Sequence, residues 1–280
     1  FIWGGVIKKG PVIACLSEVL SDVRVQLLEE SRLNETPVFD EKHLTDISLH
    51  QESSVRYPHN PLCRKVYLEL SAPSLTDTLP DVERLQRAFN HTVGSPLRII
   101  SLDCIRTLPG ILRESGFRIT VTYALKNGAL ELIDVESGDK TGRTVGMAVD
   151  IGTTTVMANM VNLNDGGVLA SAAVYNSQLP YGEDVINRIL YTQENKKGLQ
   201  ELNRLIVGDV NALVHTLAEK TGINAANVSY MVCTGNTIMI HLFLGIPPEN
   251  IRKEPYIPVV GIPPTLQAEE IGVGSNRRGS

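Results

Sequence analysis

The sequence predicts a mixed α/β protein that contains more than one structural unit. Three observations indicate this class: the composition is that of a globular chain, residues 62–142 carry a compact α+β pattern, and residues 143–273 carry three strand-like segments followed by alternating helix and strand patterns. Of the 280 residues, 42% are hydrophobic and 20% charged, so there is enough apolar material for a packed core. At roughly 100–200 residues per domain, we expect about two domains.

Composition and charge argue against several classes of function. The net charge is −5, without a basic stripe, which argues against nucleic acid as a partner. No apolar run approaches the roughly 18 residues that a membrane-spanning helix needs, so we expect no membrane partner. The cysteines form no C-x-x-C pair, which argues against a zinc ribbon or a secreted disulfide framework and favours a reducing, cytoplasmic setting. These cysteines are Cys15, Cys63, Cys104 and Cys233.

The first sixty residues predict little independent structure. Strand patterns occur at Pro11–Cys15 and Asp22–Leu28, but two strands alone would not be stable. Residues 31–61 are polar and contain three prolines, which predicts a linker with a domain boundary near Asn60. The chain starts on Phe1 rather than Met, and we expect this to be a cut end.

Residues 62–142 predict a small α+β domain. Its most specific local signal is Asn127-Gly128, a dipeptide typical of tight hairpin turns. Another is Thr78, which could cap a helix that has Pro80 in its first turn. The expected elements are a strand at Cys63–Leu70, a helix with the apolar stripe Val82, Leu85 and Phe89, a short helix near Leu108–Ser115, and the hairpin strands Arg118–Leu125 and Ala129–Val135.

Residues 143–273 predict three hairpin-linked strands, then helix, strand and helix. The strands are expected at Met147–Ile151, Thr155–Val161, Val168–Tyr175 and Val228–Cys233, and the helices at Asp184–Tyr191, from Leu199 to Thr221, and from Asn236. The order β-β-β-α-β-α is that of one half of an actin-like, ribonuclease H-like nucleotide-binding domain, although topology alone does not establish function. Residues 274–280 are expected to form a tail.

The segment Asp150–Thr155 carries the clearest chemical signal. It follows a buried strand and contains Asp150, Gly152, Thr153, Thr154 and Thr155. A glycine lets backbone approach a phosphate, successive amides and threonine hydroxyls can donate to phosphate oxygens, and a carboxylate can hold hydrated Mg²⁺. The alternative is a tight β-turn in which Asp and Thr satisfy their own backbone.

A second turn, Cys233–Thr237, joins a strand to a helix and is expected at the same end of the sheet. Its Gly235, Asn236 and Thr237 could contact a ligand, because ligands bind at the carboxyl ends of strands in α/β sheets. The simpler interpretation is helix capping by Asn236 or Thr234.

Several longer motifs, taken in order, resemble one family: the reductive activators of corrinoid proteins, which are ferredoxin-fused members of the ASKHA superfamily of actin-like ATPases. In the second half these motifs are Val149–Thr155, Asn176-Ser177-Gln178, Tyr181–Ile189, Gly235–Met239, His241–Gly245 and Pro255–Pro258. The preceding domain resembles the middle domain of that family in Pro73–Asp77, Asp81, Arg84-Leu85 and Leu108–Arg113.

The resemblance implies a fold, cofactors and roles. Residues 1–30 would be the end of a [2Fe–2S] ferredoxin domain with Cys15 as its fourth cluster ligand, 62–142 the middle domain, and 143–273 the first half of the ATPase domain. Asp150 would organise Mg²⁺, Gly152 to Thr155 would hold the terminal phosphates of ATP, and Gly235 to Thr237 would line the hinge side of the cleft. This chain would then be an interior piece of the intact protein.

The resemblance also implies an activity and partners. The intact protein would use ATP hydrolysis to pass an electron from its cluster to a Co(II) corrinoid protein, restoring Co(I). The implied partners are a corrinoid iron–sulfur or corrinoid methyltransferase protein and an upstream electron donor. A second copy of the chain, in a homodimer, is a further possible partner. Two alternatives are a small-molecule kinase of the same superfamily and a non-enzymatic docking module with a vestigial nucleotide site.

Other marked residues have simpler interpretations. His215 and His241 lack a second ligand at metal-binding spacing, so we expect packing or surface positions. Glu183 and Asp184 could approach the cleft or place negative charge at a helix N-terminus.

Overall fold

A computed structural model describes residues 2–3, 6–7, 59–61 and 63–274. The chain divides into two compact units, Phe1–Thr36 and Pro37–Ser280. In the first unit, β1 (Ile2–Trp3) pairs antiparallel with β2 (Val6–Ile7). Cys15, the strands expected at 11–15 and 22–28, the linker up to residue 58 and the tail from residue 275 lie outside the described residues.

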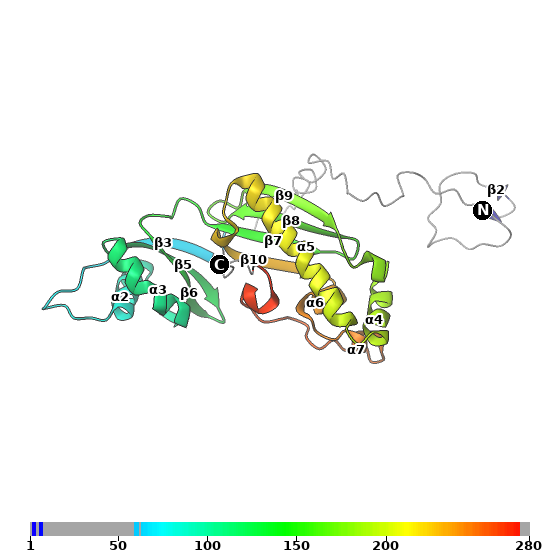
Figure 1. Ribbon diagram of the computed structural model, residues 1–280. Coiled ribbons are helices and arrows are strands. Elements are labelled where there is room, and N and C mark those ends of the chain that lie inside the picture. The colour runs from blue at the N-terminus through cyan, green and yellow to red at the C-terminus, as the bar shows by residue number, and fades with distance from the viewer. Residues whose placement is uncertain (1, 4–5, 8–58, 62, 275–280) are drawn as a thin grey trace. The chain divides into compact units, whose positions relative to one another are not determined.

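The small α+β domain is a four-stranded sheet with two helices on one face (Figure 1). Its strands run in the order β3-β5-β6-β4, and all pairs are antiparallel except β4 with β6. Leu85, Phe89 and Leu112 of the helices are fully buried against the sheet. The elements are β3 (Cys63–Glu69), α2 (Asp81–Val93), β4 (Leu97–Ile100), α3 (Leu102–Glu114), β5 (Arg118–Lys126) and β6 (Ala129–Ser137).

Local signals in this domain were partly misleading. The hairpin turn is as predicted: Asn127 (φ 51°) and Gly128 (φ 78°) both adopt the positive φ of a type I′ turn. Thr78 does not cap α2, which begins after Pro80 without a side-chain cap. Helix α3 begins well before the predicted start, because Ser101 Oγ accepts the Cys104 amide (3.2 Å) and Pro109 lies inside the helix rather than in its first turn.

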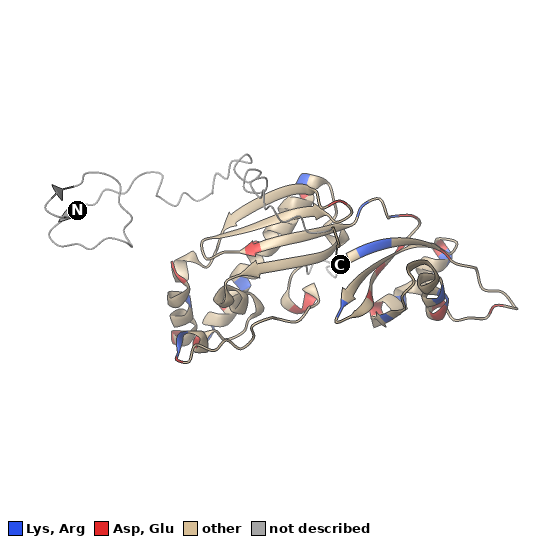
Figure 2. Ribbon diagram, turned by 180° about the vertical axis from the view of Figure 1, so that it is seen from behind, with Lys and Arg blue, Asp and Glu red and all other residues tan. Residues whose placement is uncertain are grey.

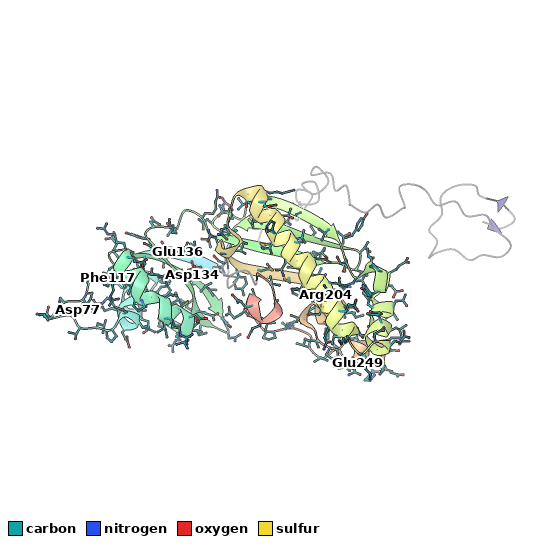
Figure 3. The ribbon with its side chains drawn as sticks, in the orientation of Figure 1. Asp77, Phe117, Asp134, Glu136, Arg204 and Glu249 are labelled. Atoms are coloured by element: carbon teal, nitrogen blue, oxygen red, sulfur yellow. The ribbon has the colours of Figure 1, made fainter. Side chains whose placement is uncertain are left out.

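The loop between β3 and α2 is fastened by a buried arginine. Arg84 is 1% exposed and donates from Nη1 to Asp77 Oδ2 (2.6 Å) and to the Ser71 carbonyl (2.9 Å). The bond from Arg84 to the carboxylate holds the pKa of Asp77 at about 2, well below its ordinary value. Figure 3 labels Asp77 in this loop, and Leu75, two residues before it, is fully exposed. The loop is therefore a fixed structure that presents an apolar side chain.

The second sheet has the strand order β10-β7-β8-β9. β7, β8 and β9 form an antiparallel meander, and β10 joins β7 in parallel on the other side, which agrees with the predicted half of an actin-like domain. The strands are β7 (Val145–Ile151), β8 (Thr155–Asn162), β9 (Val168–Tyr175) and β10 (Val228–Gly235). The helices are η3 (Leu179–Tyr181), α4 (Val185–Glu194), α5 (Gly198–Thr221), η4 (Ala225–Asn227), α6 (Thr237–Leu244), α7 (Glu249–Arg252) and η5 (Ala268–Ile271).

Helix α5 covers this sheet and supplies much of its core (Figure 1). Its buried residues recur at helical spacing, and the helix stops at Gly222, which has the left-handed φ of 67°. Each fully buried Leu or Ile contributes roughly 1.5–3 kcal/mol, so the meander is a rigid base for the turns at its end. The buried face of α5 includes Leu202, Ile206, Val210, Leu213 and Leu217. Within the described parts of the chain, no helix is at once long and apolar enough to cross a bilayer.

Candidate functional site

The two predicted turns lie at the same edge of the second sheet. β7 and β10 are parallel, with Asp150 opposite Thr234 and Ile151 opposite Gly235. Both strands therefore end together, and the chain leaves β7 into residues 152–154 and leaves β10 at Asn236. This is the juxtaposition that the sequence predicted.

Asp150 is the one charged residue in the four strands of this sheet, all of which the structure describes in full. Figure 2 shows the sheet in tan apart from a red segment. The residue is exposed, and no described residue forms a hydrogen bond or ion pair with its carboxylate. Because this carboxylate has no structural partner among the described residues, it is available to bind a cation.

The bend after β7 is closed by its own backbone. The Gly152 amide donates to the Thr155 carbonyl (3.0 Å), and a Cβ on Gly152 would lie 2.5 Å from that oxygen. Glycine is thus required here by close backbone approach. One expectation is corrected: the Gly152 amide is already bonded within the turn and is not available to a phosphate.

The carbonyl groups of Gly152, Thr153 and Thr154 accept hydrogen bonds from two buried residues. Asn176 Nδ2 donates to the Gly152 carbonyl (2.9 Å) and the Asn176 amide to the Thr154 carbonyl (2.8 Å). Arg188 Nη2 donates to the Thr153 carbonyl (2.6 Å). Asn176 and Arg188 are 1% and 0% exposed.

This bonding fixes the direction of the neighbouring amides. In a trans peptide the C=O of one residue and the N–H of the next point in opposite directions. The amides of Thr153 and Thr154 therefore point away from Asn176 and Arg188, and neither bonds to any residue in the described part of the chain. Free N–H groups on successive residues of a turn can form an anion-binding concavity.

The second turn combines capping with a contact to the first. Asn236 Oδ1 accepts the Met239 amide (2.9 Å), so Asn236 caps α6, in line with the simpler interpretation. Its Nδ2 donates to Thr153 Oγ1 (3.3 Å). One side chain thus starts the helix and ties the two turns together. Thr237 is the first helical residue, and Thr234 remains in β10.

An open groove of about 490 Å³ lies where the turns meet. Thr153 and Asp184 both line it, and Asp184 Oδ1 also caps α4 by accepting the Asn187 amide (2.8 Å). Both interpretations of Asp184 therefore apply. The lining residues are Thr153, Glu183, Asp184, Val185, Asn236, Thr237, Ile238 and Ile251.

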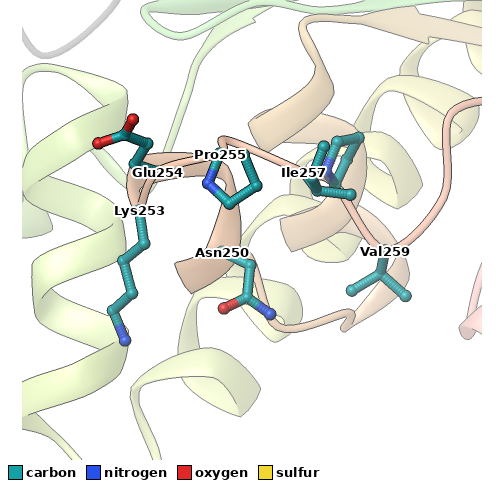
Figure 4. Close-up of a pocket in the computed structure, with 7 residues that line it drawn as sticks. Asn250, Lys253, Glu254, Pro255, Ile257 and Val259 are labelled. Carbon is teal, nitrogen blue, oxygen red and sulfur yellow. The ribbon is translucent and has the colours of Figure 1, made fainter.

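A second, smaller pocket of about 230 Å³ lies along the segment after α7 (Figure 4). Asn250, Lys253, Glu254, Pro255, Ile257, Pro258 and Val259 line it. No predicted site residue is among them, whereas Thr153, Asn236 and Thr237 line the larger groove.

A buried polar network behind the bend was not assigned a role from sequence. Gln178 Nε2 donates to the Leu202 carbonyl (2.8 Å), and its Oε1 accepts from Arg188 (3.1 Å). Asp209 of α5 accepts the Ser177 amide (2.8 Å), and burial raises the pKa of its carboxyl. A signal did exist: Asp209 stands on the otherwise apolar face of a helix, between Ile206 and Val210.

The remaining candidate ligands are dispersed. His241 is buried, with Nδ1 on the Thr237 carbonyl (2.7 Å) and Nε2 accepting the Val259 amide (3.2 Å), whereas His215 is on the surface. Both agree with the predicted packing and surface positions. Among residues 59–61 and 63–274, no group of three or more His, Cys, Asp or Glu side chains is placed to hold a metal. Cys63, Cys104 and Cys233 are free.

The family is decided by two family models that match adjoining parts of the chain. The RACo linker region matches residues 53–142, and the RACo middle region matches residues 145–280. The chain belongs to the RACo family. The RACo middle region thus contains both predicted turns and the groove.

Two relatives agree with the RACo assignment. A solved structure of a reductive activator for corrinoid, iron–sulfur protein is 36% identical, with a TM-score of 0.72 over 78% of this chain and 35% of that one. The corrinoid activation enzyme RamQ of Eubacterium limosum is 24% identical over 212 residues, which are 75% of this chain and 34% of RamQ. The chain therefore spans about a third of the length of these relatives.

Proposed function

We propose that the protein containing this chain is an ATP-dependent reductive activator of a corrinoid protein. The names of the two relatives support a role in corrinoid activation. The observation in this chain that supports the use of ATP is the bend at residues 152–154. Its carbonyls are bonded to Asn176 and Arg188, and the amides of Thr153 and Thr154 have no bonding partner among the described residues.

The residues present fit a nucleotide with Mg²⁺. The free amides and the Thr153 hydroxyl would donate to the terminal phosphates, and the absence of a side chain at Gly152 lets the bend keep its tight shape. Asp150 would hold Mg²⁺ through water, because Mg²⁺ keeps several waters and takes one or two protein carboxylates. Asn236 and Thr237 would line the hinge side. Phosphoryl transfer depends mainly on such positioning and charge neutralisation.

The electron-transfer part depends on a cluster that the described residues do not hold. A bound [2Fe–2S] cluster would supply the single electron that converts Co(II) to Co(I), and hydrolysis of ATP to ADP and phosphate would drive this uphill transfer. Plant-type clusters need four cysteines, and the proposed ligand Cys15 lies outside the described residues. We assign no step of the transfer to Cys63, Cys104 or Cys233, which lie in separate elements.

ATP would act on the partner through domain closure. A nucleotide held by both halves of an actin-like domain favours the closed state, and a ligand shifts such an equilibrium by its difference in affinity for the two states. We propose that closure changes the affinity for a corrinoid iron–sulfur or corrinoid methyltransferase protein. An upstream electron donor would reduce the cluster again.

The test uses the full-length protein with its reduced cluster and a Co(II) corrinoid protein. Absorbance reports Co(I) formation with and without ATP in wild type, Asp150→Ala and the control Asp103→Ala, whose carboxylate lies on the surface of α3. We expect ATP stimulation in wild type and control and its loss in Asp150→Ala. Unchanged turnover in Asp150→Ala would remove the metal assignment. Phosphorylation of a small metabolite would favour a kinase, and a wild type without nucleotide affinity would favour a docking module.

A further inference from the structure

The side chain of Arg188 is buried without an acidic partner. It is 0% exposed, and among the described residues no carboxylate lies within ion-pair distance of it. Asp184 acts on it through space, but both Asp184 oxygens accept hydrogen bonds from Asn187. Burial lowers the pKa of Arg188 to about 10, and the group remains charged at neutral pH.

The partners of this guanidinium are neutral, and they are spread over three nitrogens. Nε donates to the Gly182 carbonyl (3.0 Å), Nη1 to Gln178 Oε1 (3.1 Å) and to Met239 Sδ (3.1 Å), and Nη2 to the Thr153 carbonyl (2.6 Å). The hydrogen bonds are satisfied, but the charge is not neutralised. Burying an ion without a counter-charge is unfavourable by several kcal/mol.

The other large buried arginine shows the usual arrangement. Arg84 is equally buried, but its guanidinium bonds directly to the carboxylate of Asp77 (2.6 Å). Arg188 therefore differs from Arg84 in having no carboxylate within ion-pair distance among the described residues. Its Nη2 bonds to the carbonyl of the peptide group whose N–H, on Thr154, has no bonding partner among the described residues.

We propose that Arg188 is a positioning residue with two effects. Its bond to the Thr153 carbonyl fixes the orientation of the peptide group and thereby the direction of the Thr154 amide. Its unneutralised positive charge favours the nucleotide that carries the most negative phosphate charge. This rests on the proposed nucleotide function. Removal of the charge weakens binding of ATP more than of ADP, and of ADP more than of AMP. A purely structural role would weaken all three equally or only lower the fraction of folded protein.

Gln178 offers a way to cancel the charge while Arg188 stays in place. Its Oε1 lies 3.1 Å from Arg188 Nη1, so Gln178→Glu sets a carboxylate of the same shape against the guanidinium. The bond from Arg188 to Thr153 is retained, and the bond to the Leu202 carbonyl is lost. If Arg188 only holds the loop, this new ion pair leaves the nucleotide preference unchanged.

The experiment measures dissociation constants of Mg²⁺-ATP, Mg²⁺-ADP and AMP by calorimetry on the full-length protein. The variants are Arg188→Met, Gln178→Glu and the control Arg84→Met, and circular dichroism reports folding. We expect the ATP-to-AMP preference to fall by on the order of tenfold in both site variants and to stay constant in the control.

The outcomes separate this inference from the proposed function. If wild type binds no nucleotide, the proposed function fails. If wild type binds ATP but Gln178→Glu keeps the full ATP-to-AMP preference, the role given to Arg188 is wrong. Should Arg188→Met not fold, Gln178→Glu still decides, because an unfolded fraction changes the stoichiometry and not the ratio of dissociation constants.

Discussion

Gly235 and the carbonyl oxygen of Ile151 are so close that a Cβ on Gly235 would lie 2.7 Å from that oxygen. This backbone approach occurs where β10 and β7 end together, and it sets the separation of the two turns. Any side chain at residue 235 would push the strand ends apart, and with them Asn236 and Thr153.

Gly235→Ala is therefore expected to weaken nucleotide binding and to lower the free energy of unfolding by roughly 1–3 kcal/mol, as for other overpacked sites. The matched control is Gly142→Ala, since a Cβ at Gly142 meets nothing within 4 Å. Thermal unfolding and ATP titration of both variants measure the effect. Equal behaviour of the two would contradict the close approach.

Asn176→Ala removes the donor to the Gly152 carbonyl and the acceptor of the Gln178 amide. Both groups are left without a partner, which is unfavourable by roughly 1–3 kcal/mol for each buried group. We expect lower stability, measured by urea unfolding, together with weaker ATP binding, because the bend loses one of the bonds that orient it. A variant that loses stability but binds ATP as tightly as wild type would show that the orientation of the bend does not matter.

Asp150→Asn is expected to leave stability unchanged within about 0.5 kcal/mol, because surface groups without partners have little effect. The apparent affinity for Mg²⁺ in ATP hydrolysis should fall, since an amide is a neutral and weaker ligand for a hard cation. A Mg²⁺ titration of ATPase activity in the full-length protein measures this. An unaltered Mg²⁺ requirement would place the metal elsewhere.

The low pKa of Asp77 predicts that the stability of the small domain depends on pH. Its pKa is about 2 in the folded state against an ordinary 3.8, chiefly because Arg84 bonds to the carboxylate. The contribution of the ionised Asp77 carboxylate to folding stability is fully present above pH 3.8 and is lost as the pH falls through about 2. Melting temperatures of wild type and Asp77→Asn should thus differ near neutral pH and converge towards pH 2. A constant difference across this range would mean that the charge of Asp77 does not contribute.

Gly208→Ala should stabilise the protein. Gly208 is exposed within α5, its φ is not in the left-handed region, and a Cβ there meets nothing within 4 Å. Alanine loses less conformational freedom than glycine in a helix, so the free energy of unfolding should rise by about 0.5–1 kcal/mol. Denaturant unfolding measures the gain, and a loss of stability would indicate an unseen contact of the helix backbone.

The elements with strong periodicity could be predicted from sequence. The Asn127-Gly128 hairpin, the meander and the long helix α5 all lie close to their expected bounds. β4 was missed because Leu97–Ile100 is short and does not alternate. The start of α3 was predicted too late: the helix begins at Leu102, where Ser101 Oγ accepts the Cys104 amide.

The site could be predicted only in part. The two turns and the acid were visible as local motifs, and their common edge followed from strand order. The orientation of the peptide groups was not visible, because Asn176 and Arg188 reach the bend from 24 and 35 residues away. Such bonds depend on tertiary packing, so a local pattern cannot reveal which amide is bonded and which is free.

The contact between Asn236 and Thr153 also bears on how the protein folds. It joins residues 83 positions apart, and the parallel strand β10 can align beside β7 only after α5 has carried the chain back along the sheet. Closure of such long loops is slow compared with hairpin formation. We therefore expect the meander to form early and the ligand groove to be completed last, by the arrival of β10.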